Sequence, residues 1–251
     1  MTAWNRGRFR KLASRAVDLD TINRELTLEA KDKDIFLRGC LAHIFILEDM
    51  VVEKTICLVN NHLFHDPKFE FIKYGEMAYL GKEIEKMREE YGTEAVIWSG
   101  DFNSMPYSNN LRFAYKLPRM MIPFSQLKAV EMQKPKIIDE IHRVYGRENP
   151  FVVRSAYDQF YETSEEIGME NVGTYSRSIK VAHPSFTNWT SGFKDTLDYI
   201  FYSPEFFEVK ELGDLIEASE LQKSNIDKLP NAKLKQPSDH LAIRCILEWR
   251  S

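Results

Sequence analysis

Four short polar motifs hold the residue types that could do chemistry in this 251-residue chain. In chain order, they are Asn60-Asn61-His62, Gly100-Asp101-Phe102-Asn103-Ser104, Leu197-Asp198-Tyr199 and Ser238-Asp239-His240. Carboxylates and carboxamides supply the oxygen ligands that a hard cation such as Mg²⁺ prefers. Histidine can give a proton, or positive charge, to a transition state that carries negative charge. The four motifs together therefore indicate metal-assisted attack on a phosphodiester.

Each motif adjoins an apolar run, and these runs decide where the polar side chains meet. The runs are rich in the β-branched, aromatic and aliphatic residues typical of buried strands: Thr55–Val59, Ala95–Ser99, Tyr199–Tyr202 and Leu241–Leu247. Gly100 permits a tight exit from its strand, and Asp101 and Asn103 then point to the same side of an extended backbone. A polar cap on the strand end would explain these two residues alone. Four motifs in order favour one pocket at the rim of a sheet sandwich.

The rest of the pattern predicts the elements around that pocket. Apolar residues recur at helical spacing over Glu70–Tyr91 and charges fill the other face, which predicts a long amphipathic helix. Thr21–Asp34 is a polar connection or short helix, Ser125–Tyr145 a charged insertion with helical periodicity, and Ser219–Gln236 a loop. The expected strands are Ile35–Glu48, Lys54–Val59, Ala95–Ser99, Thr196–Tyr202, Phe206–Leu215 (continuing the same sheet) and Leu241–Trp249. Strands in two layers with helices outside predict a four-layer α/β sandwich.

Composition limits the class of protein. The chain is 43% hydrophobic and 29% charged, which is ordinary for a globular protein with one sizeable core. No apolar stretch approaches 18 residues, so we expect no membrane span. Cys40, Cys57 and Cys245 lie in apolar runs without metal-type spacing, and we expect them to be buried and reduced.

The net charge of −4 indicates no general affinity for polyanions, so nucleic-acid binding would depend on a local basic patch. A solvated helix face is the other interpretation of the basic residues that could form such a patch. These residues are Lys128, Lys134, Lys136 and Arg143.

The ordered motifs resemble the endonuclease/exonuclease/phosphatase superfamily, whose members include deoxyribonucleases, abasic-site endonucleases, inositol phosphatases and deadenylases. Finer features resemble one branch of it, the carbon-catabolite-repressor-type deadenylases, with nocturnin, the angel proteins and the mitochondrial 2′-phosphodiesterase as relatives. These features are Pro184–Trp189 followed by Gly192–Phe201, the segment His62–Pro67, and Leu229-Pro230-Asn231 before the last motif. The resemblance covers nearly the whole chain, from Trp4 to Trp249.

This resemblance implies a single domain over residues 1–251, built as two mixed sheets packed face to face with helices outside. It implies a Mg²⁺-dependent phosphodiesterase, with Mn²⁺ as a substitute, and most specifically a 3′-to-5′ exoribonuclease that releases 5′-AMP from poly(A) 3′ ends. RNA would be the partner, a deadenylase-type complex the assembly and the cytoplasm the location, with nucleus and mitochondrion left open. A 2′,5′-oligoadenylate phosphodiesterase or a nucleotide phosphatase is the alternative within the same class.

The resemblance also implies roles for single residues. Asp101 would orient or deprotonate the attacking water, and Asn103 would donate its amide to the scissile phosphate, which an acceptor-only Asp could not do. His240 would donate to the phosphate oxygens, with Asp198 on its other ring nitrogen. The remaining expected contacts are His62 and Asn188 to phosphate, Pro67 and Phe193 to a nucleobase, and Asp101, Asn103 and Asp239 to the metal.

One part of the superfamily pattern has no counterpart here. Full domains begin with a strand that carries an Asn and a later strand that carries the Glu that is the principal metal ligand, both before the segment resembling Trp4–Leu19. Glu25 and Glu29 lie in a polar stretch where a solvated loop is expected. The chain is therefore expected to match the C-terminal three-fifths or so of the usual domain. A catalytically inactive fragment or regulatory partner is the third hypothesis.

Overall fold

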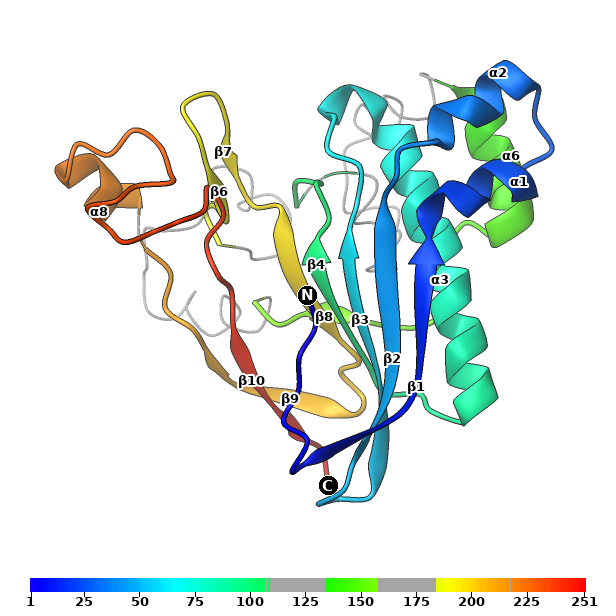
Figure 1. Ribbon diagram of the computed structural model, residues 1–251, viewed down its shortest axis with the longest axis horizontal. Helices are drawn as coiled ribbons and strands as arrows, with labels where there is room; N and C mark the ends of the chain where they lie inside the picture. The colour runs from blue at the N-terminus through cyan, green and yellow to red at the C-terminus, as the bar shows by residue number, and fades with distance from the viewer. Residues whose placement is uncertain (107, 109–133, 158–183, 217) are drawn as a thin grey trace.

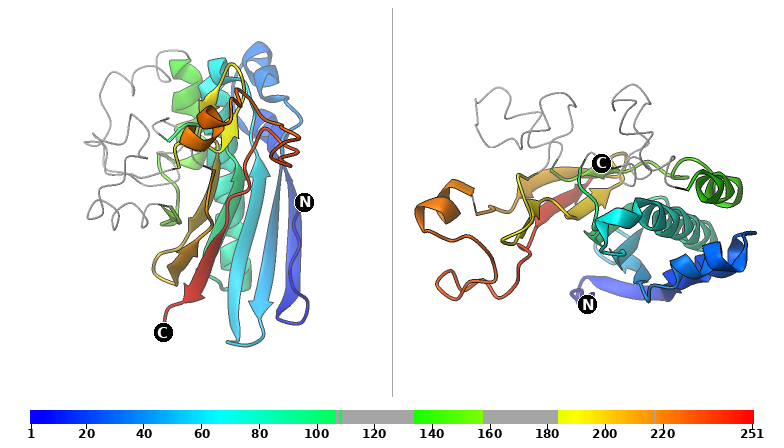
Figure 2. Two further views of the ribbon diagram at one scale, coloured as in Figure 1. Left: turned by 90° about the vertical axis from the view of Figure 1, so that its left-hand side faces the viewer. Right: turned by 90° about the horizontal axis from the view of Figure 1, so that it is seen from above.

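The computed structural model describes residues 1–106, 108, 134–157, 184–216 and 218–251. Within them, a six-stranded mixed sheet carries helices on one face and a two-stranded sheet on the other (Figures 1 and 2). The predicted α/β class, with helices outside the large sheet, is thereby confirmed. Over the described residues, no helix combines the length and the apolarity needed to cross a bilayer.

The large sheet has the strand order β1-β2-β3-β4-β8-β5. Its strands are β1 (Phe9–Asp18), β2 (Leu41–Asp49), β3 (Lys54–His62), β4 (Val96–Asp101), β5 (Arg154–Ser155) and β8 (Asp198–Tyr202). β3 and β4 run parallel, and every other neighbouring pair is antiparallel. Parallel neighbours need a crossover, which here contains α3 (Glu70–Tyr91). The carboxyl ends of β3 and β4 consequently meet at the same edge of the sheet.

Helix α3 packs its apolar residues against one face of the large sheet. Met77 and Ile84 of the helix and Trp98 of β4 are all fully buried in one core cluster. The helix ends where Gly92, at a φ of +63°, donates its N–H to the carbonyls of the last turn. The predicted helix is confirmed with the bounds Glu70–Tyr91. The charged face expected for it is not found over Phe71–Gly81, because every residue there is buried, Lys73 and Glu76 included.

Shorter helices complete this layer beside α3. α6 (Pro135–Tyr145) contributes its buried isoleucines to the same cluster. α1 (Ile22–Glu25) and α2 (Ala30–Lys33), together with the 3-10 turns η1 (Leu19–Thr21) and η2 (Asp34–Phe36), occupy the stretch between β1 and β2. The polar segment over Thr21–Asp34 is therefore short helix, which was one of the two expected forms.

The smaller sheet consists of antiparallel β9 (Phe207–Leu212) and β10 (Cys245–Trp249). Phe207 packs in one cluster with Ile56 and Tyr202 of the large sheet, so this second core lies between the two sheets. The fully buried carboxylate of Asp49 joins the layers, because it accepts hydrogen bonds from Arg8 at 2.7 Å and from the indole N–H of Trp249 at 3.2 Å. The hairpin of β6 (Asn188–Trp189) and β7 (Lys194–Asp195) extends beyond the end of β8.

Several expected elements have different bounds or partners in the structure. The strand expected over Ile35–Glu48 begins only at Leu41, because η2 and Gly39, at a φ of +71°, precede it. The strand expected over Phe206–Leu215 is β9, and it pairs with β10 rather than continuing the large sheet. The expected loop Ser219–Gln236 contains most of helix α8 (Ala218–Lys223).

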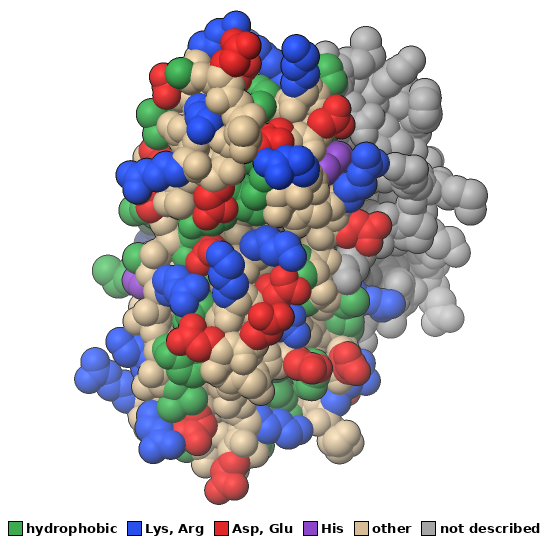
Figure 3. Space-filling model, turned by 90° about the vertical axis from the view of Figure 1, so that its right-hand side faces the viewer, with side chains coloured by type: hydrophobic (Ala, Val, Ile, Leu, Met, Phe, Trp, Pro, Cys, Tyr) green, Lys and Arg blue, Asp and Glu red, His purple; other side chains and the backbone are tan. Residues whose placement is uncertain are grey.

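The other predictions about the described residues vary in outcome. All three cysteines are free, but Cys40 and Cys245 are half-buried rather than buried. Of the basic residues considered as a patch, Lys134 lies 3.6 Å from Asp32 and Arg143 is paired with Glu140 at 2.7 Å. Figure 3 shows cations and anions interspersed over this helical face. Lys128 lies outside the described residues, as does the first part of the charged insertion expected over Ser125–Tyr145.

Candidate active site

Backbone register places three of the predicted site residues in one row. His62, at the end of β3, pairs with Asp101 at the end of β4, and Asp101 pairs with Asp198 at the start of β8. Residues at one register position emerge on the same face of a sheet, so these side chains stand side by side. The Nε2 atom of His62 lies 3.5 Å from Oδ2 of Asp101.

Gly100 makes this close approach of β3 and β4 possible. Its φ is +148°, and a side chain there would collide with the backbone of Asn61. Asn61 in turn donates from Nδ2 to the Asp101 carbonyl at 2.9 Å and accepts the indole N–H of Trp98 at 2.6 Å. The polar end of β3 and the end of β4 are thus locked together immediately below the site.

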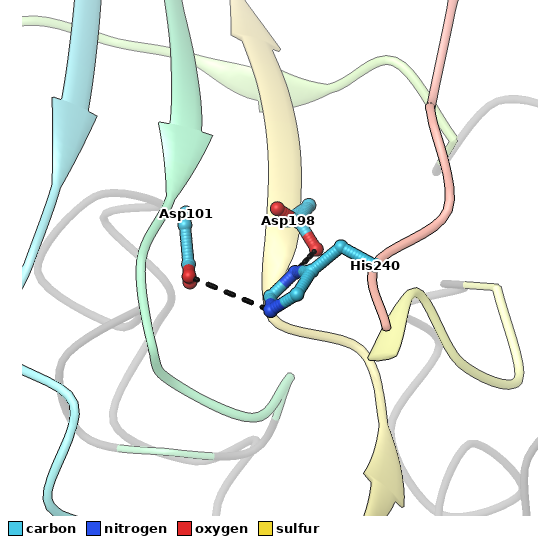
Figure 4. Close-up of side chains that lie close together, drawn as sticks. All are labelled: Asp101, Asp198 and His240. Carbon is cyan, nitrogen blue, oxygen red and sulfur yellow. Dashed lines mark hydrogen bonds and ion pairs between the residues drawn. The ribbon is translucent and has the colours of Figure 1, made fainter. Parts of the chain in front are cut away.

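His240 lies in a segment far along the chain from Asp101 and Asp198, and its side chain stands next to theirs (Figure 4). Its Nδ1 lies 2.8 Å from Oδ2 of Asp198, and its Nε2 lies 3.9 Å from Oδ2 of Asp101. The hydrogen bond with Asp198 is the main cause that raises the pKa of His240 to about 9, against partial desolvation that lowers it. The imidazole is therefore protonated at neutral pH, with one N–H on Asp198 and the other facing Asp101.

Asp101 is mostly buried, with 14% of its side chain exposed. Burial, followed by the charge of Asp198, raises the pKa of its carboxyl group, whereas the backbone N–H of Asn103 and the two histidines lower it. Oδ1 accepts that N–H at 2.7 Å, so Oδ2 is left facing His62 and His240. A carboxylate whose pKa lies above its ordinary value is a stronger base.

Asn103 follows Asp101 in a left-handed conformation, with a φ of +46°. Its side-chain Nδ2 donates to the carbonyl oxygen of Leu63 at 2.8 Å, which ties the loop after β4 to the loop after β3. A carboxamide nitrogen carries two N–H donors, so this contact still leaves one for a bound phosphate. Within the part of the chain that the structure describes, no donor contacts the Asn103 side-chain oxygen Oδ1, which can act as an acceptor.

Asn188 and Asp239 lie beside His240. Asn188 forms a backbone bridge with His240, and its Nδ2 donates to Oδ2 of Asp239 at 3.2 Å. Asn188 is buried and Asp239 is half-buried. The two residues are therefore next to the cluster, and their side chains are engaged with one another.

Pro67 and Phe193 lie outside the polar cluster. Pro67 is exposed and begins the 3-10 turn η3 (Pro67–Phe69), directly before α3. Phe193 is 37% exposed in the turn between β6 and β7, where Thr190 bonds to its backbone at both N–H and carbonyl. Figure 1 shows that the start of α3 and this hairpin lie at the same end of the large sheet.

A groove of about 750 Å³ adjoins the cluster, between the large sheet and the chain segment that leads into β10. His62, Asp101 and Asp198 belong to its lining. Apolar residues from both sides, such as Ile200 and Ile243, line it further along. The reactive groups are therefore reached from an open groove rather than enclosed in the core.

Asp101, Asp198 and His240 form an acid–histidine cluster. The side chains present suit a hard divalent cation bound at Asp101 better than one bound by all three residues. Asp101, Asp198 and His240 each bring one ligand atom within 4.8 Å of the others. However, a protonated imidazole cannot bind a metal, and Oδ2 of Asp198 already accepts from His240 and, at 2.7 Å, from Thr187. Asp101 and the acceptor oxygen of Asn103 remain, and Mg²⁺ commonly binds through one or two carboxylates plus substrate phosphate.

One family model matches residues 32–240 of this chain, a range that contains all four motifs. The chain belongs to the endonuclease/exonuclease/phosphatase family. Ccr4, a 3′-5′-exoribonuclease subunit of the CCR4-Not complex in Aspergillus niger, is 29% identical over 245 residues that cover 86% of this chain and 32% of that protein. 2′,5′-Phosphodiesterase 12 of Rattus norvegicus is 24% identical over 263 residues, covering 99% of this chain and 37% of that protein. The chain thus spans about a third of the length of these relatives.

Solved structures confirm the family fold. The human Nocturnin catalytic domain with bound sulfate superposes with a TM-score of 0.56 at 19% identity, covering 98% of this chain and 62% of that one. ANGEL2, a 2′,3′-cyclic phosphatase in complex with adenosine-2′,3′-vanadate, gives a TM-score of 0.65 at 20% identity, covering 97% and 68%. At such identities, the likeness shows the endonuclease/exonuclease/phosphatase fold.

Two residues near the site were not predicted from the sequence. Thr187 donates to Asp198, and its Oγ1 also accepts the backbone N–H groups of Leu197 and Asp198, so it fixes the residue that holds His240. Its only sequence signal was its place in the motif Pro184–Trp189. Lys73 is buried in α3. The clue to it in the sequence was a charged residue at helical spacing from the apolar residues, four positions before Met77.

Proposed function

We propose that this chain carries the chemistry of a Mg²⁺-dependent phosphodiesterase, most specifically a 3′-to-5′ exoribonuclease of the deadenylase type that releases 5′-AMP from poly(A). The observation that supports it best is the pairing of a protonated His240 with the carboxylate of Asp101, 3.9 Å apart. A cation and a base at one point can bind a phosphate oxygen and accept a proton from water beside it. Family membership and the Ccr4 relative support the choice of a phosphodiester substrate.

Asp101 and His240 would divide the chemistry between them. Asp101 orients the attacking water and takes its proton, since burial raises the pKa of its carboxyl group. His240 donates its Nε2–H to a phosphate oxygen as negative charge develops there. Asp198 keeps the ring protonated and oriented through Nδ1, and Thr187 holds Asp198 in place.

Three further residues would contact the phosphate from the rim. His62, whose side chain is 72% exposed, is free to turn toward a ligand from the end of β3. Asn103 offers the N–H that its contact with Leu63 leaves over. Asn188 would contribute its amide, which now lies on Asp239.

Asp101, Asn103 and Asp239 would hold the Mg²⁺ ion, for which Mn²⁺ would substitute. When bound, such a cation neutralises charge on the phosphate and lowers the pKa of a coordinated water. Removal of divalent ions by a chelator is expected to abolish hydrolysis, and added Mg²⁺ to restore it.

Phe193 and Pro67 would contact the nucleobase of the substrate, one on each of its two faces. A nucleobase has an apolar face, and stacking an aromatic side chain on it contributes about 1–3 kcal/mol. An exposed aromatic ring in a turn has such a face to offer, and the start of α3 with Pro67 lies at the same end of the sheet. RNA is the partner that this arrangement suits.

A 2′,5′-oligoadenylate phosphodiesterase is the second candidate, because 2′,5′-phosphodiesterase 12 aligns with 99% of this chain. Oligo(A) carrying a 5′ label, made with either 3′,5′ or 2′,5′ linkages, would be incubated with this protein and Mg²⁺. We expect stepwise shortening of the 3′,5′ substrate with release of 5′-AMP, and none with Asp101→Ala. Preference for the 2′,5′ substrate would favour the second candidate. Hydrolysis of neither would favour the catalytically inactive regulatory partner.

The assembly and the compartment follow only from the deadenylase proposal. Ccr4 of Aspergillus niger is a subunit of the CCR4-Not complex. We propose a comparable complex for this chain and a cytoplasmic site of action, with the nucleus and the mitochondrion as the other locations to compare. Fluorescence microscopy of the tagged chain, with co-purification of its partners, tests both.

A further inference from the structure

Helix α3 carries a buried lysine that the proposed chemistry does not use. The side chain of Lys73 is only 1% exposed, and its Nζ donates to the backbone carbonyl oxygen of Asn103 at 2.7 Å. Oε1 of Glu70, one turn earlier, lies 2.6 Å from the same nitrogen. A buried ammonium is unfavourable unless it is paired and hydrogen-bonded, so both contacts are needed to keep it there.

The partner of Lys73 is the residue on which the loop after β4 depends. Asn103 lies in the left-handed region, and its backbone N–H reaches Oδ1 of Asp101 at 2.7 Å. Its side chain crosses to the carbonyl of Leu63 at 2.8 Å. Asn103 thus contacts the helix, the acid and the neighbouring loop at once, and Lys73 is its anchor on the helix.

We propose that Lys73 is a positioning residue for the site. Lys73 holds the backbone carbonyl of Asn103 against helix α3. This contact keeps two other hydrogen bonds of Asn103 in place: the one from its backbone N–H to Asp101 and the one from its side-chain amide to the carbonyl of Leu63. The inference rests on the proposed function for its effect on turnover, but the anchoring itself can be measured without turnover. A lysine that only fills the core would leave the loop unchanged when replaced by an apolar side chain of similar length.

Two variants of the full chain and one control test this. Lys73→Met removes the donor, and Glu70→Gln with Lys73→Met removes the donor together with the negative charge of Glu70. Lys82→Met is the control, because Lys82 makes a comparable pair with Glu85 at 2.9 Å on the same helix but is more than one-third exposed. Hydrogen–deuterium exchange is followed over residues 101–106, α3 and β2.

We expect exchange over residues 101–106 to become about 10-fold to 100-fold faster in both Lys73 variants, the loss associated with a charge-assisted hydrogen bond. α3 and β2 keep their rates in at least the double variant, and Lys82→Met changes none of the segments. Exchange over 101–106 that matches the control, or that rises equally in all segments of both variants, overturns the inference.

Turnover on oligo(A) adds the functional readout. In the variant that keeps the rates of α3 and β2, kcat is expected to fall about 10-fold to 100-fold, with KM nearly unchanged, as for residues that support others at a site. A normal kcat despite faster exchange would show that the loop is anchored but not catalytically coupled, which also overturns the inference. If the unmodified protein hydrolyses no substrate, the proposed function fails, while the exchange experiment still decides whether Lys73 anchors the loop.

Discussion

The acid–histidine cluster and the outer contacts differ in how the fold holds them. Asp101, Asp198 and His240 are at least half-buried, and His240 lies within ion-pair distance of both carboxylates. Pro67 and Phe193, by contrast, are exposed and stand on turns outside the cluster. The first set is ordered by strand register and mutual bonds, the second only by the loops that carry it. We therefore expect mutations to affect the proposed chemistry and the proposed base recognition separately.

The largest effect is expected when the cluster itself is broken. Asp101→Ala and His240→Ala should each lower kcat on oligo(A) by about 10²–10³ or more, since each removes an interaction made in the transition state. Both side chains stand at the rim of the sheet, so circular dichroism should show an intact fold. Turnover close to that of the unmodified protein in either variant, assayed with Mg²⁺, would remove the cluster from the mechanism.

The next effect should fall on the outer contacts alone. Phe193→Ala is expected to raise KM for oligo(A) about tenfold, because stacking on a base is lost, while kcat changes little. Hydrolysis of a small phosphodiester without a base should stay unchanged. An equal loss on both substrates would show that Phe193 supports the turn instead, and that the two regions are not separable.

A smaller effect is a shift in pH dependence. Asp198→Asn removes the main cause of the raised pKa of His240, which should fall from about 9 towards its ordinary 6.5. Because the proposed donor is the protonated ring, the alkaline loss of activity should then begin at lower pH. Rate profiles over pH 5–10, with the His240 pKa followed by NMR, measure the shift. An unchanged alkaline limb would mean that another group controls it.

The smallest effect concerns stability. The folded-state pKa of His240, about 9, lies above its ordinary 6.5, so the protonated ring stabilises the fold. This contribution is fully present below pH 6.5 and is lost as the pH rises through about 9. Thermal unfolding should therefore show a modest fall in Tm between these values that is absent in His240→Gln. Solvent at the half-exposed ring limits its size, and an identical fall in both proteins would assign it to other groups.

Much of the site could be predicted because its signals are local. The polar ends of the strands and the spacing of Asp101 and Asn103 depend on neighbouring residues, and the bounds of α3 follow from its period and from Gly92. The placement of Asn188 beside His240, which was expected only as a phosphate contact, rests on a bridge between separate segments. Thr187 could not be singled out, since a threonine just before a short strand has no distinguishing pattern until Asp198 lies next to it.

The amino-acid sequence by itself determined which residues stand at strand ends, where α3 begins and ends, and which family the chain resembles. Periodicity and turn chemistry act between residues that are close along the chain. Only the tertiary structure decided that β9 pairs with β10, that His240 reaches Asp101, and that Lys73 anchors Asn103. These contacts join segments far apart in the chain, and their free energy depends on burial and on the packing of whole layers, which no local pattern specifies.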